Sequence, residues 1–251
     1  MGLKTIIFAL VLILLLAFQT RAAGPRGRYD FYKVAIRWPK SFLNSGKSVQ
    51  RGGYSHKPTL TNFTIHGLFP MYTIDEVVPP YDEDSGCTES KPKRPEFITI
   101  ELFDDYDLLT DMKTYWPDVA YYRNMTDNLQ FWRREWQKHA MCFDRPDMPT
   151  YYYKTALRAR KKFDFLDTLI KANIKPNNEK YNRTVIGKVA SDYVGKKVEI
   201  SCNTDSKGNR QLDEILVCYT RNGNERPCPF RFTYCGDEDE FILFPSAAAA
   251  A

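Results

Sequence analysis

The apolar and polar positions of the chain predict strands near both ends and helices between them. Residues 32–38 alternate polar and apolar side chains and end at Pro39, which is typical of a half-buried strand. A second β-rich run starts at Phe63 and carries His66 into a turn at Gly67. Further strands are expected at residues 198–202, 214–219 and 230–234, with a hairpin turn at Asn222 and Gly223 between the last two.

Helical spacing of apolar residues fills the middle of the chain. A tryptophan-rich helix is expected to run up to Cys142, with Asp127 and Gln130 as a cap at its start. Because strands and helices are segregated rather than alternating, their order predicts an α+β fold with an antiparallel sheet. The other expected helices are 104–116, 151–157, 163–174 and 183–194, and residues 75–95 are expected to form a long loop.

One globular domain is expected after a targeting segment. Residues 1–22 contain Lys4, an apolar run and small residues at the end, a pattern typical of a cleaved secretory signal peptide. A membrane anchor is the alternative, but a span needs about 20 apolar residues and this run is shorter. We therefore expect residues 23–251 to form a single secreted, extracellular domain without a membrane partner, with a frayed Ala-rich C-terminal end.

Charge alone does not identify a partner. The chain carries a formal net charge of +5, and loss of Lys4 and Arg21 with the signal peptide leaves 34 basic against 31 acidic residues. The densest basic run, residues 158–162, is expected to be a solvated helix face, with a phosphate-binding track as the alternative.

Two short segments carry the candidate chemistry. Residues 63–70 read F-T-I-H-G-L-F-P and contain His66, while residues 131–142 read F-W-R-R-E-W-Q-K-H-A-M-C. On a helix, Glu135 and His139 share one face, which is also compatible with an ordinary surface pair on a packed core helix. Two histidines on separate elements can, however, serve as an acid and a base.

Together these segments resemble the paired active-site signatures of the ribonuclease T2 family, which includes plant S-ribonucleases and their S-like relatives. The family signatures look like F-T-I-H-G-L-W-P and F-W-x-H-E-W-x-K-H-G-T-C, and weaker similarity runs from about Tyr29 to Pro245. The resemblance implies a central antiparallel sheet with helices packed against it. It also implies that the two histidine segments meet in a cleft.

The resemblance further implies a role for each site residue. RNA carries its own nucleophile, the 2′-hydroxyl, so cleavage needs a base, an acid and positive charge at the phosphorane, without a metal or another cofactor. His139 would be the base and His66 the acid, with Glu135 and Lys138 supporting the transition state. The substrate would be held by Arg134, Phe131, Phe69 and Lys33.

Several positions depart from the family pattern. Arg134 replaces an auxiliary histidine, and Lys33 replaces a glutamine that contributes to base binding. Ala140 replaces a glycine, which would cost of order 1 kcal/mol if the backbone there needs a positive φ. Leu43 replaces the first cysteine of a family disulfide whose partner is also missing, so we expect Leu43 to be buried in compensation.

Six cysteines in an exported chain predict a disulfide framework whose pairing the sequence leaves open. A zinc site is the alternative, but the chain has no Cys-x-x-Cys pair. By the resemblance, the pairs are Cys87 with Cys142, Cys202 with Cys235, and Cys218 with Cys228. Three sequons make Asn62, Asn124 and Asn182 candidate glycosylation sites.

Two classes of function follow. The first is a secreted, monomeric endoribonuclease that cleaves single-stranded RNA through a 2′,3′-cyclic phosphate and leaves DNA intact. As a self-incompatibility S-ribonuclease it would also have protein partners. The second is a catalytically weak or inactive ribonuclease-fold glycoprotein with a binding or storage role. The joint presence of His66, Glu135, Lys138 and His139 favours the enzyme, since a silent site has no reason to keep these groups together.

Overall fold

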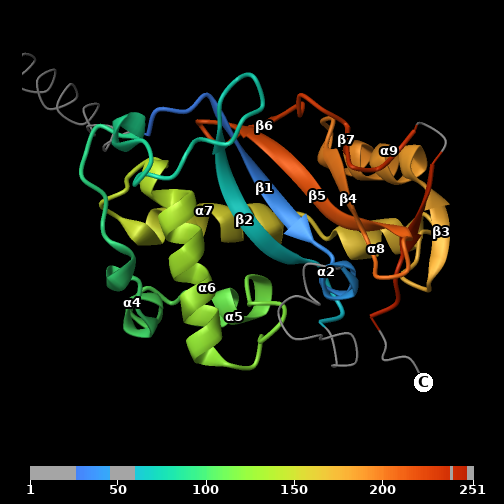
Figure 1. Ribbon diagram of the computed structural model, residues 1–251, viewed down its shortest axis with the longest axis horizontal. Helices are drawn as coiled ribbons and strands as arrows, with labels where there is room; N and C mark the ends of the chain where they lie inside the picture. The colour runs from blue at the N-terminus through green and yellow to red at the C-terminus, as the bar shows by residue number, and fades with distance from the viewer. Residues whose placement is uncertain (1–26, 46–59, 238–239, 248–251) are drawn as a thin grey trace, which may run out of the picture.

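The computed structural model describes residues 27–45, 60–237 and 240–247, and one twisted sheet crosses their centre (Figure 1). The expected signal peptide, residues 248–251 of the expected frayed end, and His56, the third histidine of the sequence, lie outside the described residues. The main strands are β1 (Phe31–Arg37), β2 (Thr64–Met71), β4 (Glu199–Thr204) and β5 (Arg210–Thr220). Shorter strands are β3 (Glu179–Asn182), β6 (Glu225–Arg226), β7 (Phe232–Thr233) and β8 (Phe241–Phe244).

The pairing of the strands confirms the α+β prediction. Neighbouring strands follow the order β2-β1-β5-β4-β7, and β1 pairs antiparallel with both β2 and β5. The parallel contacts, β4 with β7 and β5 with β8, involve one or two residue pairs each. The central sheet is therefore antiparallel, with short parallel additions at its margin.

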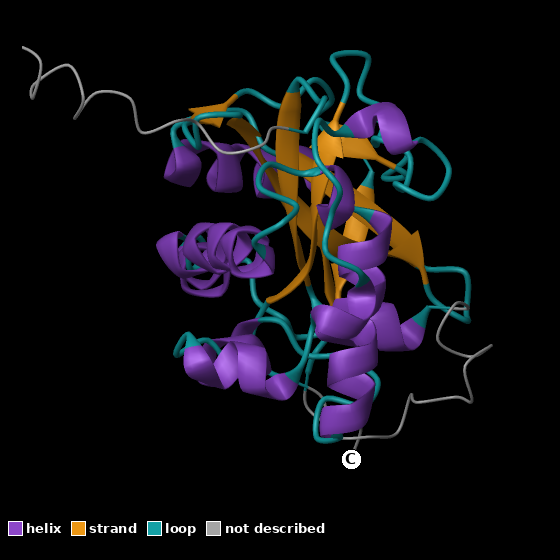
Figure 2. Ribbon diagram, turned by 90° about the vertical axis from the view of Figure 1, so that its left-hand side faces the viewer, coloured by secondary structure: helices purple, strands orange, loops and turns teal. Residues whose placement is uncertain are grey.

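Helices lie on both sides of the twisted strands (Figure 2). Helix α7 packs against β1 and β2, while α6 lies in front of the sheet near β2 (Figure 1). The helices are α2 (Pro39–Asn44), α4 (Ile100–Asp105), α5 (Leu109–Tyr115), α6 (Met125–Lys138), α7 (Pro149–Lys162), α8 (Phe165–Lys171) and α9 (Arg183–Val194). Three short 3-10 turns are η1 (Ser85–Cys87), η2 (Pro95–Phe97) and η3 (Ala140–Cys142).

Two buried tryptophans anchor α6 as its apolar stripe predicts. Trp132 and Trp136 are fully buried, and their indole N–H groups donate to the carbonyl oxygens of Trp116 (2.6 Å) and Lys93 (2.7 Å). A buried indole needs such a partner, because an unpaired polar group in the core is costly. The adjacent stripe of α6, with Phe131 and Glu135, is thereby fixed toward the strand that carries His66.

Three local predictions are wrong. The expected helix at 104–116 is divided into α4 and α5, because Asp107 has a positive φ of 55° and ends the first helix. Helix α6 is capped by Asn124, whose side chain accepts from the N–H groups of Thr126 and Asp127, so Asp127 is not the cap. The turn at residues 222–223 joins β5 to the short strand β6 instead of to a strand near residue 230.

The three predicted disulfides are confirmed: Cys87 with Cys142, Cys202 with Cys235, and Cys218 with Cys228. The first ties the loop before α4 to the segment that follows α6. Leu43 is 3% exposed and packs against Ala120, as expected for a residue that replaces a half-cystine.

The basic run at 158–162 is largely structural. Arg160 is buried and donates to the carbonyl oxygen of Phe63 at 3.0 Å. Lys161 pairs with Asp111 at 2.8 Å, and Lys162 pairs with Glu225 at 2.5 Å. These three side chains already have partners within the protein, which argues against a phosphate-binding track at residues 158–162.

Candidate active site

His66 lies at a β-bulge in strand β2. Where β1 pairs with β2, Ala35 lies opposite Gly67 and Ile36 lies opposite Ile65, which leaves His66 as the extra residue. A bulge interrupts the alternation of side chains and re-aims the extra one, often beside an active site. The bulge thus takes His66 out of the regular side-chain alternation, and its side chain is 29% exposed.

Gly67 continues strand β2, so the turn expected at this glycine is wrong. The absent side chain has a steric consequence instead. A Cβ at this position would overlap Oε2 of Glu135 and the ring of Phe69. Glycine therefore allows α6 to bring the Glu135 carboxylate directly against the strand that carries His66.

Helix α6 supplies the second histidine at its C-terminal end. The backbone N–H of His139 donates to the carbonyl oxygen of Glu135 at 3.0 Å, and Glu135 is 6% exposed. The ring of Phe69 contacts both imidazoles edge-on, with centroid distances of 5.4 Å to His66 and 4.7 Å to His139. The ring of Phe69 thus contacts both histidines and separates their imidazoles.

A cleft of about 220 Å³ opens beside these residues. Arg134 lines it with a side chain that is 45% exposed, and its Nη2 lies 3.5 Å from Oδ2 of Asp118. Neither His139 nor Phe69 lines this cleft, but the Phe69 ring contacts both His139 and His66, and His66 does line it. The predicted residues in its walls are His66, Phe131, Arg134, Glu135 and Lys138, joined by Arg37, Phe42, Ile65, Asp118 and Val119.

Lys33 does not belong to this group, contrary to the expectation that it binds substrate. Its Nζ lies 2.7 Å from Asp75 and 2.6 Å from Glu199, and the residue is 4% exposed. A lysine buried between two carboxylates has almost no surface left for a base. Its role here is to neutralise those carboxylates at the sheet.

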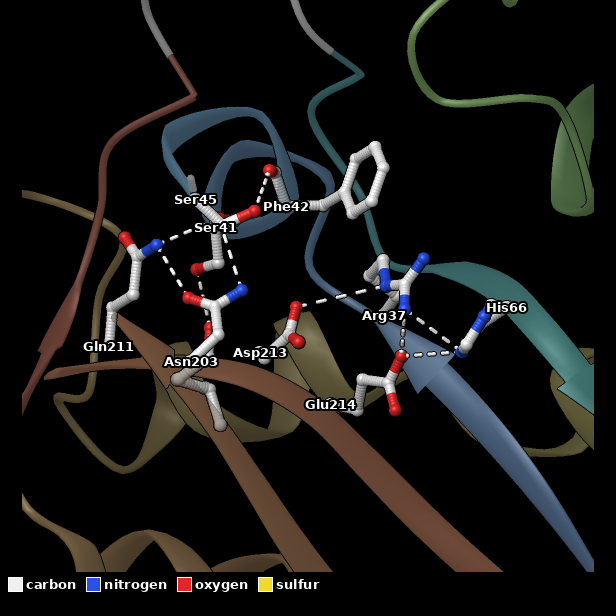
Figure 3. Close-up of polar contacts among 10 residues, drawn as sticks. Arg37, Ser41, Phe42, Ser45, His66, Asn203, Gln211, Asp213 and Glu214 are labelled. Carbon is white, nitrogen blue, oxygen red and sulfur yellow. Dashed lines mark hydrogen bonds and ion pairs between the residues drawn. The ribbon is translucent and has the colours of Figure 1, made fainter. Parts of the chain in front are cut away.

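The sequence did not predict an ion network behind His66 (Figure 3). Oε1 of Glu214 lies 2.7 Å from Nδ1 of His66 and 2.6 Å from Nη2 of Arg37. Arg37 and Glu214 are direct cross-strand partners on β1 and β5, and Nε of Arg37 lies 3.7 Å from Asp213. The opposite charges were visible in the sequence, but their meeting depends on a strand pairing between distant segments.

This network fixes the proton on the His66 ring. Nη2 of Arg37 also lies 2.9 Å from Nδ1, but an arginine N–H can only donate, so Nδ1 cannot serve both neighbours. The shorter contact to the Glu214 carboxylate favours an Nδ1–H that donates to Glu214. We therefore assign the other ring nitrogen, Nε2, as the one free to face a substrate.

Opposing effects set the charge of the two acidic residues on β5. Burial pushes the pKa of Glu214 upward, but the charges of Arg37 and His66 outweigh it and lower the pKa to about 2. For Asp213, burial dominates and, together with the Glu214 charge, raises the pKa to about 6 despite Arg37. Glu214 is therefore ionised near pH 7 and can support His66.

The pKa values of His139 and Glu135 are also shifted from their ordinary values. Burial, followed by the charges of His66 and Lys138, lowers the pKa of His139 to about 3, so this ring is neutral near pH 7. Its Nδ1 is buried and has no hydrogen-bond partner among the described residues. Burial raises the pKa of Glu135, and the charges of His66, Arg37 and others partly offset the rise.

This arrangement can perform acid–base chemistry on an anion. A neutral imidazole lies near an imidazole held by a carboxylate, and Arg37, Arg134 and Lys138 place positive charge at the cleft. Within the described residues, histidine, cysteine and acidic side chains form no group of three or more suited to a metal ion. No helix in this part of the chain is both long and apolar enough to span a membrane.

The alanine at position 140 does not strain the backbone. Ala140 begins the turn η3, is fully buried, and is not among the described non-glycine residues with positive φ. The condition under which alanine would be costly is therefore not met. The site geometry around His139 does not require glycine here.

Comparison with known sequences gives a consistent picture. The sequence model of the ribonuclease T2 family matches residues 29–228. Ribonuclease 1 of Arabidopsis thaliana is 32% identical over 93% of this chain and 95% of its own length. A ribonuclease-like storage protein of Panax ginseng is 26% identical, over 94% of this chain and 91% of its own.

Solved structures agree with the fold. The crystal structure of RNase NT in complex with 5′-AMP superposes with a TM-score of 0.65 and 26% sequence identity. The match covers 86% of this chain and 98% of RNase NT.

Proposed function

Because the chain belongs to the ribonuclease T2 family, we propose that it is an active endoribonuclease that cleaves single-stranded RNA by transesterification. The observation that carries this proposal is the contrast between the two histidines. His139 is held neutral by burial, whereas Nδ1 of His66 lies 2.7 Å from the Glu214 carboxylate. The neutral ring suits a base, and a histidine that donates to a carboxylate suits an acid.

In the proposed mechanism the two rings exchange protons with the substrate. His139 accepts the proton of the 2′-hydroxyl, and the 2′-oxygen attacks phosphorus. The bond to the 5′-oxygen breaks as Nε2–H of protonated His66 gives its proton to that oxygen, which leaves a 2′,3′-cyclic phosphate. The negative charge of the bound phosphate also raises the basicity of His139, since an anion nearby favours an imidazolium.

The cations around the cleft stabilise the transition state. Lys138 and Arg134 project from α6, and Arg37 faces them from β1. Charge that develops on the phosphorane oxygens is stabilised by such fixed donors. The buried Glu135 carboxylate, packed against Gly67, lies close enough to Arg37, Lys138 and Arg134 to interact with their charges.

The two histidine roles can be tested by substitution. Each of His66→Ala and His139→Ala should lower kcat on RNA by about 10²- to 10⁴-fold in buffer containing EDTA. The third histidine offers a matched control, and His56→Ala should retain wild-type turnover. Full activity of either active-site variant, or loss of wild-type activity with the chelator alone, would contradict the proposal.

We also propose secretion of a monomeric glycoprotein, supported by the pattern of residues 1–22 and by the three sequons. The side-chain oxygens of Asn124 and Asn182 cap α6 and α9, and that of Asn62 accepts from Phe63 N–H. These bonds leave the amide nitrogens, where a glycan is attached, unused. Intact mass before and after glycosidase treatment tests removal of the signal peptide and attachment of glycans.

We further propose a role in self-incompatibility, with protein partners. It is supported by Arg134 in place of the auxiliary histidine and by the mild positive charge of the mature chain. Binding of candidate partner proteins to the purified chain, independent of its ribonuclease activity, would test it.

A catalytically weak storage or binding protein is the second candidate, favoured by the resemblance to the storage protein of Panax ginseng. Ala140→Gly separates the two. If the site is competent as it stands, this variant should change kcat little, because Ala140 has no positive φ to relieve. A large gain in rate would favour an impaired site and the second candidate.

A further inference from the structure

Helix α6 has a hollow on each of two flanks. The stripe of Phe131, Glu135 and Lys138 faces the cleft described above. The neighbouring stripe faces a second hollow of about 330 Å³, between α6 and the loop at residues 81–96. Arg134 lines both hollows. We call the second one the basic groove; its walls are Tyr81, Asp82, Lys91, Pro92, Arg94, Pro95, Glu96, Gln130, Arg133, Arg134, Gln137 and Met141.

Positive charge in the basic groove is only partly neutralised. It contains four basic side chains against two acidic ones, and Asp82 accepts from Gln137 at 3.1 Å. Lys91 and Arg94 are exposed and take part in no ion pair within the part of the chain that the structure describes. This differs from the run at 158–162, where lysines pair with acidic residues. Unpaired cations in a hollow attract an anionic ligand.

The basic groove is also held rigidly. The Cys87–Cys142 disulfide joins its loop to the end of α6. Trp136 donates its indole N–H to the carbonyl oxygen of Lys93 at 2.7 Å, and Nε of Arg133 donates to that of Ile98 at 2.9 Å. A site held in place in advance loses less entropy when it binds. This loop is therefore a formed wall of the groove.

We propose that the basic groove binds the sugar–phosphate backbone of an RNA strand that continues beyond the scissile bond. The inference rests on the proposed ribonuclease function, because Arg134 connects the groove to the cleft where cleavage would occur. Lys91, Arg94 and Arg133 would bind flanking phosphates, and Tyr81 offers a ring on which a base can stack. Cations and an aromatic ring along a groove are the features that bind single strands without sequence preference.

A binding experiment that does not depend on catalysis tests the groove. The probe is a fluorescent 2′-deoxy oligonucleotide of about twelve nucleotides, which has the phosphates but not the attacking hydroxyl. The variant Lys91→Ala/Arg94→Ala should weaken its binding about tenfold and reduce the log–log salt slope by about 0.7 for each phosphate that the protein no longer neutralises. The matched control Lys196→Ala/Arg231→Ala removes the same charges from the hollow at the end of α9 and should bind like wild type.

Cleavage kinetics supply the second measurement. The groove variant should lower kcat/KM for the long RNA several-fold more than for a dinucleotide, while the control variant keeps the wild-type ratio. Equal loss for both substrates, or equal binding by the groove and control variants, would overturn the proposal. The proposal would also be overturned if inorganic phosphate or polyglutamate displaced the probe from the groove as effectively as unlabelled oligonucleotide does. If wild type binds the probe through the groove but cleaves no RNA, the groove stands and the proposed enzymatic function fails.

Discussion

At the scale of single residues, Glu214 acts on His66 from behind the cleft. Its ionised carboxylate receives the Nδ1–H and so orients the ring with Nε2 toward the substrate. A carboxylate in this position also stabilises the imidazolium, which is the form that donates a proton. Glu214 is therefore a positioning residue whose effect should be seen in the chemical step and not in substrate binding.

Replacing that carboxylate tests its role. Glu214→Gln keeps the shape and a hydrogen-bond acceptor but removes the charge, so kcat should fall by about 10²-fold with KM nearly unchanged. Glu225→Gln removes a carboxylate from the surface pair with Lys162 and should leave kcat at the wild-type value. Steady-state kinetics on a dinucleotide measure both, and wild-type kcat in the Glu214→Gln variant would show that this carboxylate does not assist His66.

The environment of His139 makes a prediction about pH. The base must be neutral to accept a proton, and a histidine is neutral above its pKa. Because burial lowers the pKa of His139 to about 3, the acid limb of kcat/KM for the free enzyme should lie well below the ordinary histidine value of about 6.5. A pH profile with its acid limb near 6.5 would show that His139 is not held neutral as described.

Among the helices and strands, local sequence signals predicted an element correctly where the segment determines its own structure. Helix α9 spans the predicted residues because Gly195 takes a φ of 73° and ends it, and β1 ends before Pro39. The bulge at His66 could not be predicted, since the extra residue is defined only by the pairing of β2 with β1. For the same reason the Glu214 partner of His66, 148 positions away along the chain, escaped prediction.

The contact between β2 and α6 can be tested at Gly67. Gly67→Ala places a methyl group where Glu135 and Phe69 lie, so both side chains must shift, and Phe69 contacts both histidines. Overpacking of this kind costs about 1 to 3 kcal/mol, and we expect a lower Tm with kcat reduced at least tenfold. Gly86→Ala is a control on a surface turn and should change neither. A Gly67→Ala enzyme with normal kcat would contradict the close packing at this point.

In the molecule as a whole, the Cys87–Cys142 disulfide supports both the end of α6 and the basic groove. It joins the long loop to the segment after α6, and so supports the end of the helix that carries His139 and one wall of the basic groove. Its 55-residue separation along the chain is much larger than the 10 residues between Cys218 and Cys228. In the chain-entropy model a longer loop gives the larger stabilisation.

Removal of the Cys87–Cys142 disulfide should therefore destabilise the protein more than removal of the Cys218–Cys228 disulfide. Cys87→Ser/Cys142→Ser should lower the free energy of unfolding by about 4 kcal/mol and Cys218→Ser/Cys228→Ser by about 3 kcal/mol. Urea unfolding of the two double variants gives the comparison. Only the first should also weaken RNA cleavage, because only that bridge supports α6. The reverse order of activity loss would show that the helix end is held by packing alone.

The site is proposed to cleave RNA by attack of the neighbouring 2′-hydroxyl, and product analysis tests this most directly. A dinucleotide substrate is incubated with the wild-type protein in EDTA, and the early products are identified by mass spectrometry. We predict a nucleoside 2′,3′-cyclic phosphate from the ribonucleotide and no product from its 2′-deoxy counterpart, because transesterification needs the neighbouring hydroxyl. Direct release of a linear phosphate without the cyclic intermediate, or cleavage of the 2′-deoxy substrate, would contradict the account.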